Sequence, residues 1–172
     1  MCFGPYPSTH IFRIENSKAY IKISKCLPIA EFWLLRDKAP PEASQHVFIV
    51  EAKSSSPNPR NHPDFDDYLN DIRDKLTNAL VLGIGLCTGL HKNGNDELPT
   101  AFAKLDLTTV DIKLVLIING HKEAWLVPLK DALKKKLYPI VKMLGLSPTS
   151  IIILNHEQAE SNQFISGVVP CP

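Results

Sequence analysis

The residues of this chain best suited to chemistry are Glu51 and Lys53, a carboxylate and an amine two positions apart at the end of an apolar run. Side chains alternate along a strand, so both groups point to the same side. Charge is rare inside a strand unless it is paired or holds a metal. Glu31, on the preceding apolar segment, can supply a second carboxylate. Phosphodiester cleavage needs a hard cation and a positioned water molecule. Carboxylates bind Mg²⁺ and a nearby ammonium can position water, so these residue types could supply what that chemistry needs.

Two strands have to position these groups. Residues 46–53 are mostly large and β-branched, which predicts a buried strand that ends in the Glu-Ala-Lys triplet. Residues 29–35 predict the neighbouring strand. A loop with three prolines follows the triplet at 54–63. Apolar residues at helical spacing then predict an amphipathic helix that begins with an N-cap at Asp64 and runs to about Leu82 or beyond.

The remaining pattern completes a mixed sheet. The expected elements are a β-hairpin formed by 10–15 and 19–24, a strand at 112–118, a helix at 124–144 that Pro139 kinks or splits, and a strand at 151–154. Antiparallel strands first and helical crossovers later predict an α/β (α+β) fold. In this fold a mixed central β-sheet is flanked by helices.

The length of the chain limits the number of domains. A chain of 172 residues can bury one real core but not two, which predicts a single domain over 1–172. Its parts are an irregular N-terminal lead-in at 1–9, a core at 10–160 and a flexible C-terminal tail at 161–172.

Composition narrows the class of protein and its partners. The net charge is only +1, so any surface that binds nucleic acid must be local or shared with another protein. The four cysteines lack the paired spacing of a structural zinc site, which predicts reduced thiols. Neither a signal peptide nor an apolar run of bilayer length is evident, so we expect a soluble, cytoplasmic protein without membrane contact.

The triplet and its context resemble those of a known family. A strand ending in Glu51-Ala52-Lys53, with Glu31 on the preceding strand and a helix next, resembles the PD-(D/E)xK nuclease superfamily. The resemblance covers the order of elements over about 29–154. It implies a restriction-endonuclease-like core, here preceded by the hairpin, and a Mg²⁺- or Mn²⁺-dependent nuclease that acts on DNA more readily than on RNA. Members of this size generally work as homodimers or as subunits of a larger complex.

The resemblance also implies roles for single residues. The implied catalytic residues are Glu31, Glu51 and Lys53, and the implied metal ligands are Glu31, Glu51 and the backbone carbonyl of Ala52. Family members often place a basic or amide side chain on the following helix, where it contacts phosphate. Arg73 and Lys75, which flank the apolar stripe of that helix, are the implied substrate-binding residues.

Several alternatives stay open on the sequence. Asp37 replaces Glu31 if the strand register differs, and Asp111-Ile112-Lys113 repeats the triplet pattern but precedes its apolar strand. Family members commonly carry an acidic residue on an N-terminal helix, whereas Glu15 lies in hairpin-like sequence. Glu51 and Lys53 also fit a partly buried ion pair at a sheet edge.

The leading hypothesis is a metal-dependent DNA nuclease that works alone or as a subunit of a DNA-processing or defence assembly. The alternative is a catalytically inactive protein of the same fold that binds a partner through Trp33, Trp125 or the proline-rich loop. His121, at a strand exit, is a further candidate site residue. The lysines of the second long helix spread around its circumference and fit either a solubilising face or a surface that follows phosphates.

Overall fold

The fold is built around one β-sheet. The computed structural model describes residues 1–37, 45–91, 95–120 and 123–166. In that part of the chain the strands are β1 (Ile11–Phe12), β2 (Phe32–Asp37), β3 (Gln45–Lys53), β4 (Asp111–Ile118) and β5 (Ile151–Asn155). They lie in this order across the sheet. β1, β2 and β3 pair antiparallel, whereas β3, β4 and β5 pair parallel, so the expected mixed sheet is confirmed.

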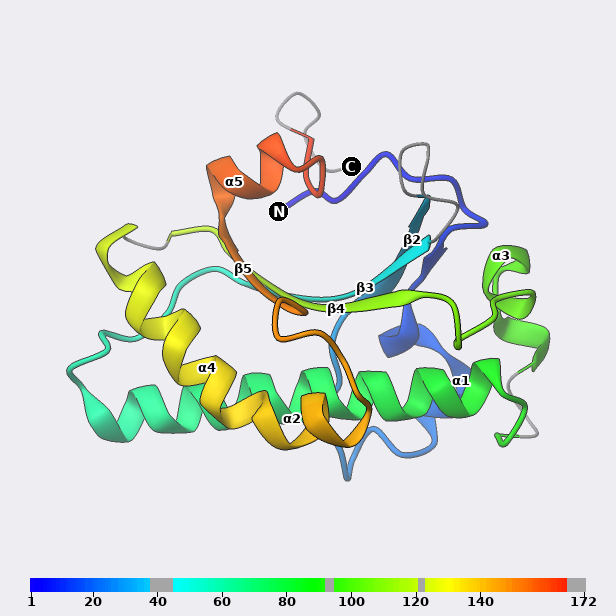
Figure 1. Cartoon of the computed structure of the whole chain (residues 1–172), viewed down its shortest axis with the longest axis horizontal. Helices are drawn as coiled ribbons and strands as arrows, with labels where there is room; N and C mark the ends of the chain where they lie inside the picture. Colours follow the sequence, from blue (N-terminus) through cyan, green and yellow to red (C-terminus); the bar gives the residue numbers. More distant parts are fainter. Residues whose placement is uncertain (38–44, 92–94, 121–122, 167–172) are drawn as a thin grey trace.

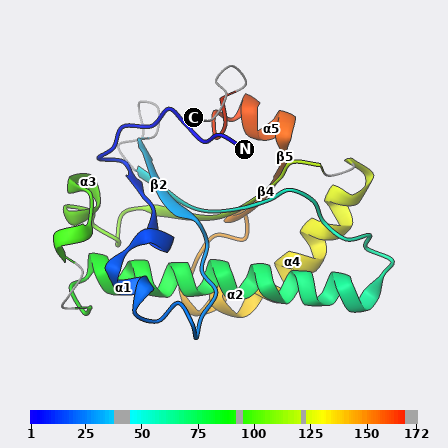
Figure 2. The same cartoon turned by 180° about the vertical axis from the view of Figure 1, so that it is seen from behind.

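Helices cover both faces of this sheet. They are the short 3-10 helices η1 (Ile14–Asn16) and η2 (Asn95–Glu97), and the α-helices α1 (Lys18–Ile21), α2 (His62–Cys87), α3 (Thr100–Ala103), α4 (Glu123–Met143) and α5 (His156–Ser161). α2 and α4 provide the crossovers that parallel strands need. Figure 1 shows α2 and α4 on one face of the sheet, with α5 and the N-terminal segment on the other, and Figure 2 shows the same layers from behind. The predicted α/β class with flanking helices is confirmed.

The two faces of β3 pack against different elements. Val47 and Ile49 are buried in the cluster that also contains Leu69 and Leu76 of α2. Val50 belongs to the cluster on the α5 side of the sheet. Because side chains alternate along a strand, Glu51 continues the face that looks toward α2.

The antiparallel start of the sheet uses other residues than the expected hairpin. β1 pairs with β2, and residues 18–21 form helix α1 instead of the second arm of a hairpin. The Ser17 side chain caps this helix by accepting a hydrogen bond from the Tyr20 N–H, and its hydroxyl donates to the Ile14 carbonyl. Ile14 and Ala19 are buried. Capping and burial therefore override the alternating pattern that suggested a strand.

The predicted helices are present with different boundaries. α2 begins at His62, with Pro63 in its first turn, rather than at Asp64. α4 runs unbroken from Glu123 to Met143 with Pro128 and Pro139 inside it, so the expected split at Pro139 is absent. The buried Leu133 and Leu137 of this helix belong to the main core cluster, and this packing offsets the hydrogen bond that a proline removes.

The ends of the chain differ from expectation in two respects. Phe164 and Ile165, placed in a flexible tail by the sequence, are buried against the α5 face of the sheet. Residues 167–172 lie outside the described residues. Cys26 and Cys87 are free as expected, whereas Cys2 is disulfide-bonded, so the prediction of reduced thiols is wrong for Cys2.

Within the described ranges, no helix combines the length and apolarity needed to cross a membrane.

Candidate active site at the end of β3

Four charged residues from β3 and α2 form a chain of ion pairs. Lys75 Nζ donates a hydrogen bond of 2.8 Å to Glu51 Oε1. Lys53 Nζ lies 3.4 Å from the same oxygen and 2.8 Å from Asp71 Oδ2. The side chain of Glu51 is only 1% exposed, while those of the two lysines are each about a quarter exposed. A buried carboxylate is costly unless it is paired and hydrogen-bonded, and here two ammonium groups meet that need.

Two buried oxygens beside these ion pairs have no hydrogen-bond partner among the described residues. They are Glu51 Oε2 and the hydroxyl of Tyr68 on α2. Burial raises the pKa of Tyr68, and the carboxylates of Glu51 and Asp71 raise it further, so the hydroxyl lies within their field. Burial likewise raises the pKa of Glu51, while Lys75 and Lys53 oppose the shift. Orphaned buried oxygens are rare in folded proteins, and a water molecule or a cation beside these two would supply the missing partner.

Glu31 lies immediately before β2 and belongs to the same electrostatic environment. Its backbone N–H donates a 3.1 Å hydrogen bond to the carbonyl of Val50, the residue before Glu51. Burial raises the pKa of Glu31 to about 7, the carboxylates of Glu51 and Glu15 add to the shift, and Lys75 opposes it. Two carboxylates therefore repel the charge of Glu31 while the Lys75 ammonium attracts it. A divalent cation would relieve this repulsion.

Two residues of this environment were not predicted from the sequence. Glu15 lies in η1, just before α1, and not in a hairpin arm. The missed signal is Ser17, a helix N-cap residue type immediately after Glu15. Asp71 lies on α2 and accepts a hydrogen bond from Lys53. No sequence pattern distinguishes Asp71 from the other acidic residues of α2.

The donor set fits Mg²⁺ only through a small number of protein ligands. No group of three or more His, Cys, Asp or Glu side chains in the described ranges is arranged to hold a metal ion. Mg²⁺ is usually bound by one or two carboxylates together with water and substrate phosphate. The free oxygen of Glu51 and the crowded carboxyl group of Glu31 fit that pattern.

The remaining predicted residues are distributed around this site. Ala52 lies between Glu51 and Lys53 in β3, where it pairs with Ile117 of β4. Lys75 contacts Glu51, whereas the guanidinium of Arg73 binds Asp74 and Asn70 on its own helix. His121 lies outside the described residues.

The two alternative carboxylates lie at the opposite end of β3. Asp37 ends β2 opposite Gln45, the first residue of β3, and accepts a hydrogen bond from the Gln45 side chain. Asp111 begins β4 and forms an ion pair with Lys113 at 2.9 Å. Its Cα partner is His46, again at the start of β3. Neither residue can therefore complete a site with Glu51.

Comparison with known proteins adds no assignment. Protein-family models, curated proteins and solved structures all give no match to this chain. A function for this chain can therefore be inferred only from the geometry at the end of β3.

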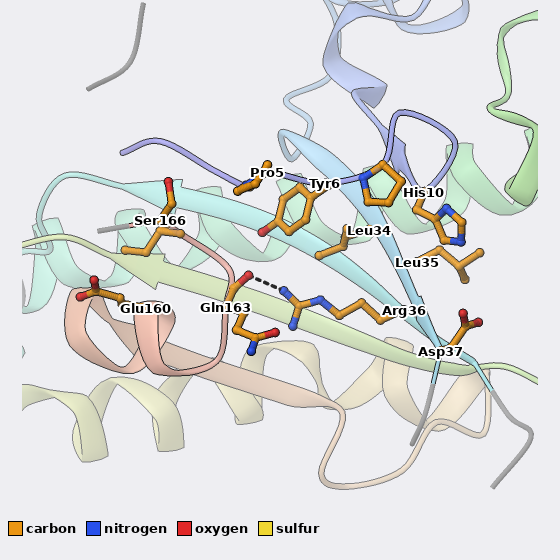
Figure 3. A pocket seen from close by; sticks show the side chains of 13 residues that line it. Pro5, Tyr6, His10, Leu34, Leu35, Arg36, Asp37, Glu160, Gln163 and Ser166 are labelled. Carbon is orange, nitrogen blue, oxygen red and sulfur yellow. Dashed lines mark hydrogen bonds between the residues drawn. The ribbon is translucent and has the colours of Figure 1, made fainter. Parts of the chain in front are cut away.

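A hollow lies on the α5 face of the sheet, away from the site at the end of β3. It has a volume of about 780 Å³ and is lined by the N-terminal segment, the end of β2 and the residues after α5. Figure 3 shows Arg36 reaching across it to the Gln163 carbonyl, to which it donates a hydrogen bond of 2.7 Å. The guanidinium also lies 4.4 Å from the ring centroid of Phe164. Arg36 therefore holds the segment after α5 against the sheet. Its guanidinium is already paired with the Gln163 carbonyl and the Phe164 ring.

The raised pKa of Glu31 predicts a pH-dependent stability. Its carboxyl group titrates near 7 in the folded chain and near 4.5 when unfolded, so the native state binds more protons between these values. We expect the free energy of unfolding of the wild type, relative to Glu31→Gln, to fall by about 1–2 kcal/mol from about pH 5 to about pH 8 after allowance for solvent screening. Urea denaturation of both proteins in metal-free buffer measures this difference. Parallel pH profiles of the two proteins would contradict the prediction.

Proposed function

We propose that this protein is a metal-dependent phosphodiesterase of the PD-(D/E)xK type that cleaves DNA. The observation that carries the proposal is the free, buried Oε2 of Glu51, which lies beside two lysines and within the electrostatic reach of Glu31. The order of elements supports it, because Glu31 precedes β2, the triplet ends β3 and a helix follows. Members of that family commonly carry an acidic residue on an N-terminal helix. Glu15 lies in the short helix η1 and could fill that role.

Each residue of the site has a distinct task in this proposal. Glu31, Glu51 and the carbonyl of Ala52 hold a Mg²⁺ or Mn²⁺ ion, which supplies Lewis-acid activation of water and neutralisation of phosphate charge. Lys53 positions the attacking water and offsets charge on the phosphorane. Lys75 holds one Glu51 oxygen by a hydrogen bond, which would leave the other oxygen available to hold the ion. Asp71 orients Lys53 in the absence of substrate.

The partner and location follow from the same reasoning. DNA is the expected nucleic acid, and a net charge of +1 favours a homodimer or a subunit of a complex in which another chain holds part of the DNA. The cytoplasm remains the proposed compartment. Two free cysteines fit that compartment, and the disulfide at Cys2 does not support it.

A second candidate function is a catalytically inactive protein of the same fold that acts as an interaction or scaffolding module. One observation favours it: Glu51 is 1% exposed and already pairs with two ammonium groups, so its charge is balanced without a cation. In this reading the four charged residues are a structural network.

Calorimetric titration with Mg²⁺ and Mn²⁺ separates the two functions. For the nuclease we expect about one ion per chain and a lost binding signal in Glu51→Gln, because this variant removes the charged ligand but keeps the shape of the side chain. Asp111→Asn, which changes a carboxylate at the far end of the sheet, is the control and should bind as the wild type does. A wild type that binds neither ion would support the inactive module.

A further inference from the structure

The outer edge of β5 is an open strand edge between two helices. β5 is the last strand of the sheet, and no described element pairs with its outer side. A groove of about 410 Å³ runs along it, lined by β5, by Lys130 and Lys134 of α4 and by Gln158 and Asn162 near α5. Figure 1 shows α4 and α5 on opposite faces of the sheet beside β5. The strand itself, Ile-Ile-Ile-Leu-Asn, carries no charge, proline or bulge that would protect an edge.

The hydrogen bonds of β5 identify which backbone groups point outward. The Ser150 carbonyl accepts a 2.7 Å hydrogen bond from the Leu114 N–H of β4, so it points into the sheet. Along a strand, the backbone N–H and C=O of one residue point to one side and those of the next residue to the other. The N–H and C=O groups of Ile151 and Ile153 therefore point to the open side. The next outward N–H, that of Asn155, is capped by the Gln158 side chain at 3.3 Å. Two residues therefore present their N–H and C=O groups to an added strand.

The side of α4 that borders this edge carries two lysines between two apolar side chains. Val127, Lys130, Lys134 and Tyr138 follow one another at helical spacing and so lie on one side of α4. Val127 is 67% and Tyr138 is 59% exposed, so each leaves apolar surface open to solvent. Lys130 and Lys134 are the charged residues that line the groove.

We infer that the β5 edge binds an extended acidic segment of a partner protein, which adds to the sheet as a further strand. The outward peptide groups of Ile151 and Ile153 supply main-chain hydrogen bonds, and the two lysines select glutamate or aspartate on the α4 side. A second copy of this chain fits less well, because pairing β5 with itself would bring the α4 lysines of both copies together. Nucleic acid fits less well because phosphates cannot satisfy the carbonyl acceptors of the strand.

The test uses a fluorescein-labelled decapeptide that alternates valine with glutamate, and its counterpart with lysine in place of glutamate. By fluorescence anisotropy we expect the glutamate peptide to bind at least about tenfold more tightly, with hydrogen exchange slowed at the amides of Ile151 and Ile153. Methylation of alternate peptide nitrogens in the glutamate peptide should lower its affinity by at least about tenfold. The Lys130→Glu/Lys134→Glu variant should invert the preference between the two peptides.

A matched variant controls for net charge. Lys104→Glu/Lys135→Glu makes the same change in charge on side chains outside the groove lining and should leave both affinities within about twofold of the wild type. Absence of binding at about 1 mM glutamate peptide, equal binding of both peptides, or unchanged exchange at Ile151 and Ile153 would overturn the inference. Displacement of the bound peptide by duplex DNA, or self-association that the groove variant abolishes, would also overturn it and identify the other occupant.

Discussion

Lys53→Ala is expected to lower the rate of plasmid nicking by about 10²–10³-fold in the presence of Mg²⁺, because removal of one group that stabilises transition-state charge typically has this effect. The Lys53 ammonium lies 3.4 Å from the Glu51 carboxylate, so it would lie near a phosphate held at an ion bound by Glu51. The same variant should keep its divalent-ion binding, since an ammonium is not a metal ligand. Loss of rate with retained ion binding identifies a catalytic role.

Arg73→Ala is the matched control for this experiment. Arg73 is also a basic residue near the site in sequence, but its guanidinium binds Asp74 and Asn70 on the outside of α2. We expect its nicking rate to stay within about threefold of the wild type. Equal losses in both variants would indicate that Lys53 acts only through general electrostatic attraction of DNA, and the proposed positioning of water would then be wrong.

Gly83→Ala is expected to destabilise the fold by about 3 kcal/mol or more, because a Cβ there would overlap a rigid ring in the core. An added Cβ would lie 2.0 Å from a ring carbon of Trp33, and Trp33 is fully buried. Helix α2 can therefore lie this close to β2 only with glycine at this position. Chemical denaturation measures the effect, which corresponds to a drop in Tm of roughly 10 °C for a chain of this size.

Gly85 provides the control on the same helix. A Cβ at Gly85 meets nothing within 4 Å. Gly85→Ala should therefore stabilise the protein by about 0.5–1 kcal/mol through helix propensity alone. If Gly83→Ala also proved neutral or stabilising, Trp33 would have to move freely, and the close packing of α2 on β2 would be wrong.

The same packing links the fold to the site. α2 supplies both Gly83, which sets its approach to β2, and Lys75, which binds Glu51. The carbonyl of Lys75 accepts a hydrogen bond of 3.2 Å from the Ala30 N–H, next to Glu31. A shift of α2 would therefore disturb the carboxylates of both strands.

Much of the fold could be predicted from patterns of apolar residues. The apolar run of β4, broken only by Lys113, and the helical stripe of α2 each required burial, and each element formed close to its expected range. The sheet begins with an antiparallel pair as expected, but the arm predicted at 19–24 was wrong because Ile14 and Ala19 are buried in two short helices, the second of which Ser17 caps. Over so short a segment, alternation of apolar and polar residues does not separate a strand from a turn of helix.

The sequence by itself determined that Glu51 and Lys53 lie on one side of the same strand, because side chains two positions apart on a strand share one side of β3 whatever the surrounding fold. Tertiary structure alone decided which other side chains join them. Arg73 and Lys75 are both basic residues at the borders of the apolar stripe of α2, and the direction in which α2 crosses the sheet brings Lys75 to Glu51 and leaves Arg73 with Asp74. Helix direction is set by packing between distant segments, and no local pattern in the sequence encodes it.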